Sequence, residues 1–386
     1  MGWRGMSTMD VRRAFVREWL ADTASRTALC LEYGVSRKTG YKWWARFEAH
    51  GRAGLTDQSR RPHTIARVAA GVRALIVAAR HRHPDWGARK LRSWLVRRDG
   101  RTAWPGRSTV HAVCVEAGLV RVVHRRIPQG RPVPAPLRVA DRPNAVWTVD
   151  FKGHFRLGSG ARCYPLTLRD LASRYTLRCD ALEGERTADT RARFERAFAT
   201  YGLPACIRSD NGKPFASPGL ARLSRLNVWW MRLGIAVEQI ALGRPDQNGS
   251  HEQFHRMLKA RTARPPAATW RAQQQRFDRF RREYNTERPH AALGDDVPAA
   301  HYALSTRPWQ RQLPPLDYPA HWEPRRVRQG GIVTWGQAPV FLSEALTGEL
   351  VAFEEVDDGV WTVHFGTVPL ARWHVRERRL RGLHAE

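Results

Sequence analysis

The sequence predicts a multidomain protein in which an all-α helix-turn-helix region precedes a mixed α/β domain and a small all-β barrel. Three observations support this fold class. A chain of 386 residues is long enough for two or three domains of roughly 150 residues each. Apolar residues recur with a helical period of about 3.6 up to residue 119 and with the period of strands from residue 144 onward. Five prolines between residues 128 and 143 separate the two patterns.

The charge balance indicates the class of partner. Lys and Arg number 65 and Asp and Glu 36, and the resulting net charge of +29 favours a polyanion such as nucleic acid. No apolar run approaches the roughly 18 residues of a membrane span. The five cysteines are odd in number and widely spaced, which indicates reduced thiols. We therefore expect a soluble, unsecreted protein with no membrane partner.

A first helix-turn-helix module is predicted over residues 1–62. A helix over residues 25–33 leads into Gly34, which can supply the positive φ of the turn, and Ser36 caps a second helix that ends near residue 50. Cys30 occupies the crossing point of the helices, and Trp43 faces inward. Basic side chains remain on the outer face, where a recognition helix would meet the DNA major groove: Arg37, Lys38, Lys42 and Arg46. A solvated helical hairpin remains the alternative.

A second module of the same kind is predicted over residues 63–124. It contains a helix over residues 88–97 and a helix over residues 109–117 that Ser108 caps. Arg107 and His111 lie at the exposed start of the latter helix and are candidate DNA contacts. A subdomain that only packs explains the same pattern about as well.

Three further segments follow: a Pro- and Arg-rich linker over residues 125–143, a core domain over residues 144–302 and a β domain over residues 322–381. Three strands and then alternating helices and strands predict a mixed α/β core. The predicted strands cover residues 145–155, 162–169, 173–181, 205–209 and 234–240, and the predicted helices cover residues 187–201, 218–232, 250–263 and 270–283.

Three acids in the core suggest metal-dependent chemistry. Asp150 lies inside an apolar run, where an unpaired carboxylate is expensive to desolvate. Asp210 follows a short strand, where turn formation would also explain it, and Glu252 opens a helix beside basic residues. Three carboxylates on separate elements suit two divalent metal ions in phosphoryl transfer.

Four motifs carry a family resemblance: WTVDFKG, IRSDNGKPFAS, GRPDQNGSHEQFHRMLK and FRREYNTERPH. Their sequence and order resemble the Asp-Asp-Glu core of bacterial insertion-sequence transposases related to retroviral integrases. The resemblance covers about residues 144–300, and helix-turn-helix modules ahead of such a core are typical of these transposases. It implies an RNase H-like core and a cytoplasmic protein that associates with the nucleoid when bound to DNA.

The resemblance implies a role for individual residues. Asp150, Asp210 and Glu252 correspond to the acids that bind two Mg²⁺ or Mn²⁺ ions, and Lys259 corresponds to a basic residue that contacts DNA. One departure is that 41 residues separate Asp210 from Glu252, more than is commonest in the family. We expect the surplus within residues 218–232, and Glu238 is the reserve candidate for the third acid.

The sequence leaves the function of two segments undecided. The YNTERPH motif, residues 284–290, matches the end of the family's catalytic domain and is more plausibly structural than chemical, although Arg288 could reach DNA. Residues 322–380 contain short strands and a strong Asp358-Gly359 hairpin signal, which predict a small barrel. Similar barrels in integrase-like enzymes bind DNA, and a role in folding or dimerisation is the alternative.

The resemblance implies a DNA transposase that binds the terminal inverted repeats of its element and target DNA as a homo-oligomer. Water would first attack the phosphodiester at an element end, and the freed 3′-hydroxyl would then attack a target strand. Two alternatives remain: a DNA-binding repressor without catalytic activity, and a metal-dependent nuclease that cuts without joining.

Overall fold

The chain divides into two compact units, Met1–Val68 and Ala69–Glu386. The computed structural model describes residues 7–58, 68–100, 102–120, 137–151, 153–217, 219–241 and 249–383, apart from the side chain of Ser250. The expected order of a helical region, a mixed α/β core and a C-terminal β region is confirmed. The finer division into five segments remains a prediction, and most of the proposed linker lies outside the described residues.

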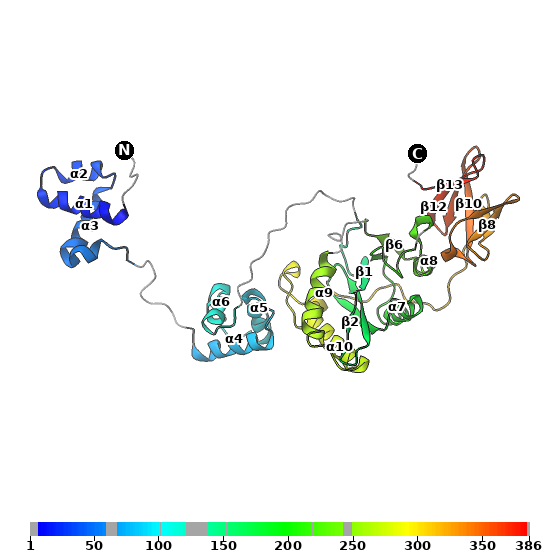
Figure 1. Ribbon diagram of the computed structural model, residues 1–386, viewed down its shortest axis with the longest axis horizontal. Helices are drawn as coiled ribbons and strands as arrows, with labels where there is room; N and C mark the ends of the chain where they lie inside the picture. Colours follow the sequence, from blue (N-terminus) through cyan, green and yellow to red (C-terminus); the bar gives the residue numbers. More distant parts are fainter. Residues whose placement is uncertain are drawn as a thin grey trace. The chain divides into compact units, whose positions relative to one another are not determined.

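The first unit is a helical module, drawn in blue in Figure 1. Its elements are α1 (Thr8–Ala21), α2 (Arg26–Glu32), α3 (Arg37–His50) and the 3₁₀ helix η1 (Gly51–Leu55). Ser25 and Ser36 cap α2 and α3, each accepting a hydrogen bond from the backbone amide three residues later. Gly34, between the two helices, has a φ of +61°. The predicted turn and the predicted second helix are therefore confirmed.

Gly40 lies where the helices of this unit cross. A Cβ at this position would lie 2.5 Å from Cys30 Sγ and 3.0 Å from Phe15 Cζ. Cys30 and Trp43 are buried as predicted. Glycine thus allows α2 and α3 to approach closely, although it is a poor helix former.

The second unit begins with three helices: α4 (Ala70–Arg82), α5 (Ala88–Arg98) and α6 (Arg107–Glu116). The prediction that Ser108 caps α6 is wrong. The helix begins at Arg107, and its N-cap is Gly106, which has extended backbone and forms no side-chain cap. Glycine is an accepted N-cap residue, and the helix starts two residues earlier than a Ser108 cap predicts.

A mixed sheet with helices on both faces forms the core. Its strands are β1 (Val146–Phe151), β2 (Phe155–Arg156), β3 (Arg162–Asp170), β4 (Thr176–Leu182), β5 (Cys206–Ser209) and β6 (Ala236–Gln239). The larger helices are α7 (Thr187–Tyr201), α8 (Arg225–Arg232), α9 (Gly249–Thr262) and α10 (Trp270–Thr286), with short turns α11 (Pro298–His301) and η4 (Ala291–Leu293). The strand order β4-β3-β1-β5-β6 combines antiparallel pairs with two parallel pairs, β1 with β5 and β5 with β6, while β2 pairs with the start of β3.

Alternate residues of β1 face opposite sides of this sheet. Trp147 and Val149 pack in one apolar cluster with α7 and α8. The opposite face is covered by α9 and α10, whose apolar side chains include Phe254. Figure 1 shows α9 and α10 on one side of β1 and α7 on the other. Thr148 and Asp150 consequently face α9.

The segment between β5 and β6 is not the single helix predicted over residues 218–232. Its described part forms the 3₁₀ turn η2 (Leu220–Arg222) and, separately, α8. Ala221 and Arg222 have positive φ, which interrupts the right-handed helical path. Ser224 then caps α8, so two short elements replace one long helix.

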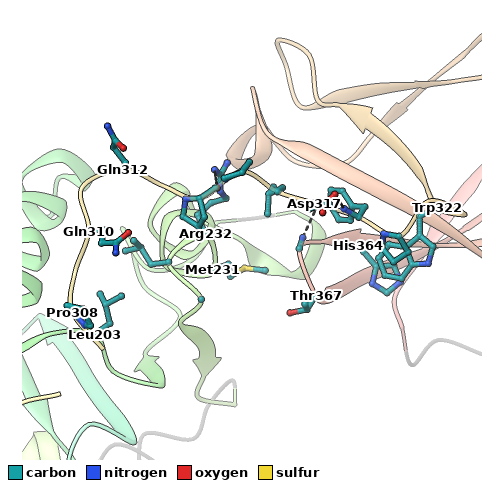
Figure 2. Close-up of a pocket in the computed structure, with 18 residues that line it drawn as sticks. Leu203, Met231, Arg232, Pro308, Gln310, Gln312, Asp317, Trp322, His364 and Thr367 are labelled. Atoms are coloured by element: carbon teal, nitrogen blue, oxygen red, sulfur yellow. Dashed lines mark hydrogen bonds between the residues drawn. The ribbon is translucent and has the colours of Figure 1, made fainter. Parts of the chain in front are cut away.

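This segment also joins the core to the C-terminal region. Leu223 and Val228 are buried in the same apolar cluster as residues of the C-terminal sheet. Arg232 Nη1 lies 2.6 Å from Glu349 Oε2. A cavity of about 630 Å³ lies beside this contact, between Met231 on the core side and Trp322 on the sheet side (Figure 2).

The C-terminal region is an antiparallel sheet in the order β13-β12-β11-β10-β7, with a separate β8-β9 hairpin. Its elements are β7 (Glu323–Arg326), β8 (Ile332–Trp335), β9 (Ala338–Phe341), η5 (Glu344–Leu346), β10 (Leu350–Asp357), β11 (Val360–Phe365), β12 (Val368–His374) and β13 (Arg379–Arg381). Asp358 and Gly359 form the predicted turn between β10 and β11. Among the described strands, β13 and β7 do not pair, so the predicted barrel is seen here as an open sheet.

No helix in the part of the chain that the structure describes has the length and apolar character needed to cross a membrane.

We predict that Gly40→Ala destabilises the first unit, even though alanine favours helices. The added methyl group would overlap Cys30 Sγ, and overpacking of this kind costs about 1–3 kcal/mol. Gly71→Ala in α4 is the control, because a Cβ there meets nothing within 4 Å. Hydrogen exchange in the full chain should show faster exchange of α1 to α3 in Gly40→Ala alone. Unchanged protection in that variant would contradict the prediction.

Candidate active site

Asp150 and Asp210 lie at the same edge of the core sheet. The parallel strands β1 and β5 pair from Val146 with Cys206 to Thr148 with Arg208. The same register, continued by two residues, aligns Asp150 with Asp210, which directly follows β5. Neighbouring strands lie about 4.8 Å apart. Two of the three predicted acids are thus brought to neighbouring positions by the strand pairing.

The surroundings of Asp210 suit a cation. Burial raises the pKa of Asp210, and the amide of Gly212, which donates to Oδ1 at 3.2 Å, offsets part of this effect. Burial also raises the pKa of Glu185, and the charge of Asp210 raises it further. Carboxyl groups with pKa values raised by desolvation and by a neighbouring acid would be stabilised in their ionised form by a bound cation. A cation bound at this edge would therefore favour the ionised form of both carboxyl groups.

Two histidines of α9 are buried against the sheet beside Asp150. His251 and His255 are 0% and 2% exposed, and their stacked rings lie 5.3 Å apart between centroids. His251 Nε2 lies 3.2 Å from Thr148 Oγ1, and His255 Nε2 lies 2.7 Å from Thr167 Oγ1. Their Nδ1 atoms face Asp150 Oδ2 at 4.0 Å and 3.6 Å.

Neither histidine was predicted from the sequence to be a metal ligand. The available signal was a pair of histidines four residues apart among the apolar residues of one helix face. Burial lowers the pKa of His251, and the neighbouring Arg169 and His255 add to this effect. The surroundings thus favour the neutral form of this imidazole.

Glu252 is on α9 between these histidines, with its side chain exposed. Among the described residues, no three His, Cys, Asp or Glu side chains are grouped closely enough to hold a metal ion. The carboxylate of Glu238, the reserve candidate for the third acid, is engaged in hydrogen bonds with other residues. Its carboxylate accepts hydrogen bonds from Arg208 Nε at 2.5 Å and from the amide of Arg138 at 2.8 Å. This pairing favours Glu252 over Glu238 as the third acid.

The candidate DNA contacts lie on the surfaces of their elements. Side chains are exposed at every predicted position except Arg46, which is partly exposed: Arg37, Lys38, Lys42, Arg107, His111 and Lys259. On α3, Lys42 Nζ and the Arg46 guanidinium carbon lie 4.7 Å and 5.0 Å from the centre of the Trp43 ring. The indole thus holds two cations at one face of α3.

Arg288 of the YNTERPH motif and neighbouring residues of α9 and α10 join the core to the segment between α4 and α5. Arg288 is 7% exposed and donates to Asp85 at 2.8 Å, so its guanidinium is engaged within the protein. Arg261 of α9 donates to Asp85 and to Glu283 of α10, each at 2.7 Å. His83 Nδ1 lies 3.2 Å from Glu283 Oε1. The structural role anticipated for this motif is therefore seen in these contacts.

Family models match most of the chain between residues 11 and 298. A helix-turn-helix domain matches residues 11–63, and a homeodomain-like domain matches residues 39–114. Integrase core domains match residues 140–245 and 233–298. The chain thus combines helix-turn-helix domains with an integrase core, which confirms the resemblance inferred from the motifs.

Two relatives come from bacterial insertion elements. The chain is 28% identical over 251 residues to an uncharacterized 31.7 kDa protein of insertion element IS407 from Burkholderia multivorans, covering 61% of this chain and 83% of that protein. It is 28% identical over 185 residues to an uncharacterized 39.2 kDa protein of insertion element IS476 from Xanthomonas euvesicatoria, covering 45% of this chain and 48% of that protein. The chain therefore spans about half the length of the second relative.

Similar solved structures include retroviral integrases. The HTLV-2 integrase catalytic core domain in complex with magnesium is 15% identical, with a TM-score of 0.34, covering 42% of this chain and 98% of that one. A simian T-cell lymphotropic virus intasome is 14% identical, with a TM-score of 0.38, covering 72% of this chain and 97% of that one.

We predict that Asp85→Asn loosens the contact of α4 and α5 with α9 and α10. Burial alone would raise the pKa of Asp85, but hydrogen bonds and charges from Arg288 and Arg261 outweigh it and hold this pKa below its ordinary value. The substitution leaves two arginines without their shared carboxylate, at a cost of about 1–3 kcal/mol. Faster hydrogen exchange in α4 and α5 should report this loss.

The same contact should weaken in acid. A lowered pKa in the folded state means that Asp85 contributes stability above its unfolded pKa of about 3.9, and that this contribution is lost as pH falls through the lower folded value. Exchange of α4 and α5 should therefore accelerate below about pH 4 in the wild type and respond less in Asp85→Asn. Asp358→Asn, which removes a fully exposed ion pair with Arg376, is the control and should behave as the wild type does.

Proposed function

We propose that this integrase-core protein is the transposase of an insertion element, and that it cleaves the 3′ ends of the element and joins them to target DNA. The observation that carries the proposal is the placement of Asp150 and Asp210 at one edge of two parallel strands beside α9. The integrase core matches include both aspartates and Glu252. Helix-turn-helix matches ahead of them and relatives from insertion elements support the same function.

In this proposal Asp150, Asp210 and Glu252 hold two Mg²⁺ or Mn²⁺ ions. Carboxylate oxygens are the ligands that these hard cations prefer, and the raised pKa of Asp210 fits a site that gains from positive charge. Such ions, when bound, lower the pKa of an attacking hydroxyl and stabilise charge on the leaving oxygen. The carboxylate of Glu252, which is exposed on α9, would complete the site when a cation is bound.

The protein would contribute mainly by positioning two phosphodiesters in turn at one site. Water first attacks the phosphodiester at the element end, which releases a 3′-hydroxyl. That hydroxyl then attacks a target phosphodiester, and the 3′-oxygen of the target strand leaves. Each step exchanges one phosphodiester oxygen for another, so no covalent bond to the protein is needed.

Double-stranded DNA would bind along the basic surfaces. The exposed face of α3 would read the terminal inverted repeats, and Arg107 and His111 of α6 would extend the recognised site. Lys259, two helical turns after Glu252, would contact a phosphate near the acids. Since two element ends must be joined together, at least two copies of the chain would act on the DNA.

We predict that wild-type protein with Mg²⁺ or Mn²⁺ joins labelled DNA carrying the ends of its element to a target plasmid. Asp210→Asn and Glu252→Gln should each abolish joining, because each removes a charge that holds the metal, while binding of the ends should persist. Glu238→Gln is the matched control and should retain joining, since Glu238 is bound to Arg208.

Each other outcome of this assay indicates a different function. Binding without joining in every sample, wild type included, would favour a DNA-binding repressor. Cutting without joining would favour a nuclease. Joining retained in Glu252→Gln and lost in Glu238→Gln would make Glu238 the third acid.

We predict that Lys42→Ala weakens binding of the element ends and lowers the slope of log affinity against log salt by about 1, because one phosphate contact is lost. Arg17→Ala on α1 is the control, an exposed arginine outside α3. Binding titrations of both variants over a range of salt concentrations measure the slopes. An equal effect of the two substitutions would count against α3 as the DNA-contacting helix.

A further inference from the structure

His251 and His255 each contact a threonine hydroxyl of the sheet. Thr167 Oγ1 donates to the carbonyl oxygen of Asp150 at 3.1 Å, and the same oxygen lies 2.7 Å from His255 Nε2. Thr148 Oγ1 lies 3.5 Å from the carbonyl oxygen of Arg169 and 3.2 Å from His251 Nε2. Each hydroxyl thus lies within hydrogen-bond distance of both a main-chain carbonyl and an imidazole.

These hydrogen bonds link α9 to the strand that carries Asp150. Thr148 lies on β1 itself, and Thr167 is the residue of β3 paired with Asp150 in the strand register. Thr167 thus contacts both the main chain of Asp150 and the ring of His255. Each histidine occupies the space between helix and sheet with its Nδ1 edge toward Asp150 Oδ2. The distance and rotation of α9 relative to Asp150 therefore depend on these two rings.

Apolar packing alone would not specify this arrangement. Phe254 and Leu258 also bury α9 against the sheet, but apolar contacts are not directional and allow the helix to slide or rotate. A buried imidazole that loses its hydroxyl partner incurs the full cost of desolvation. The two histidine to threonine contacts therefore select one position of α9 over its neighbours.

The direction of the Glu252 side chain depends on this position of α9. It lies one residue after His251 and three before His255, about 100° and 60° from them around the helix axis. Any rotation of α9 would swing the Glu252 side chain relative to Asp150 and Asp210.

We propose that His251 and His255 are positioning residues, which through Thr148 and Thr167 hold α9 so that Glu252 can complete the metal site formed with Asp150 and Asp210. This inference rests on the proposed function, since it assigns a reason for the placement of the third acid. It concerns the affinity of the site for its cation and not the chemistry of the reaction.

The test uses the full chain with Thr148→Val and Thr167→Val, which keep side-chain volume and remove only the hydroxyl groups. Thr262→Val is the matched control: Thr262 is also a buried threonine of this region, on α9, and its hydroxyl donates to Leu258 within the helix. His255→Gln is a further variant that keeps a polar side chain. Calorimetry measures Mn²⁺ binding without DNA, strand-transfer assays measure the Mg²⁺ concentration for half-maximal joining, and thermal unfolding without metal reports on folding.

We expect Thr167→Val to weaken Mn²⁺ binding and to raise the required Mg²⁺ concentration by about tenfold, the lower end of the range for residues that orient metal ligands. Thr148→Val should act in the same direction, and Thr262→Val should match the wild type. Excess Mg²⁺ should restore joining in the threonine variants, whereas it should not restore joining in Glu252→Gln.

The proposal is overturned if Thr148→Val and Thr167→Val bind Mn²⁺ as tightly as Thr262→Val does. A loss of thermal stability that accounts for all of the loss in Mn²⁺ binding would also overturn it, since a merely structural role would suffice. Failure of the wild type to join DNA would contradict the proposed function, whereas Mn²⁺ binding would still decide the inference. Wild-type protein that binds no Mn²⁺ would contradict both.

Discussion

The contact between α9 and the face of the core sheet is the constraint on which the candidate site depends. Asp150 and Asp210 are placed by strand pairing, which backbone hydrogen bonds fix without any help from side chains. Glu252 has no such support, because it belongs to a helix that could pack on the sheet in several positions. The buried contacts of His251 and His255 with Thr148 and Thr167 limit that freedom, since a buried imidazole that lost its hydroxyl partner would be desolvated without compensation. The candidate site therefore combines two aspartates placed by strand pairing with a proposed third acid, Glu252, whose position depends on polar packing.

Ion pairs anchor the C-terminal end of α9. Arg261, nine residues after Glu252, joins Asp85 of the helical bundle and Glu283 of α10 in one network, which Arg288 completes. Asp85 and Glu283 both have lowered pKa values despite their burial, because the arginines and His83 outweigh desolvation. A predicted DNA-binding module and the helix of the third acid thus share one set of ion pairs.

Elements with strong local signals could be predicted from the sequence. The residues of α7 and the turn at Asp358 and Gly359 agree with the prediction because periodicity and turn chemistry act within a few residues. The break in residues 218–232 could not be foreseen, since it depends on positive φ at two residues that are not glycine. The hydrogen bonds of Thr148 and Thr167 with α9 join residues about 90 to 100 positions apart, and no local pattern reports such pairs. The two aspartates followed from motif and strand position, whereas the groups that orient the third acid required the folded chain.

The long spacing between Asp210 and Glu252 has an explanation in the packing of this chain. Residues between β5 and β6 form η2 and α8, and their apolar residues Leu223 and Val228 are buried in the core of the C-terminal sheet and not in that of the α/β domain. Arg232 adds an ion pair to the same sheet and donates to the carbonyl of Pro314 in the connecting segment. A segment that only linked β5 to β6 would not need apolar side chains that pack against the C-terminal sheet. The segment between β5 and β6 therefore provides an attachment surface for the C-terminal region, which accounts for the length of chain between Asp210 and Glu252.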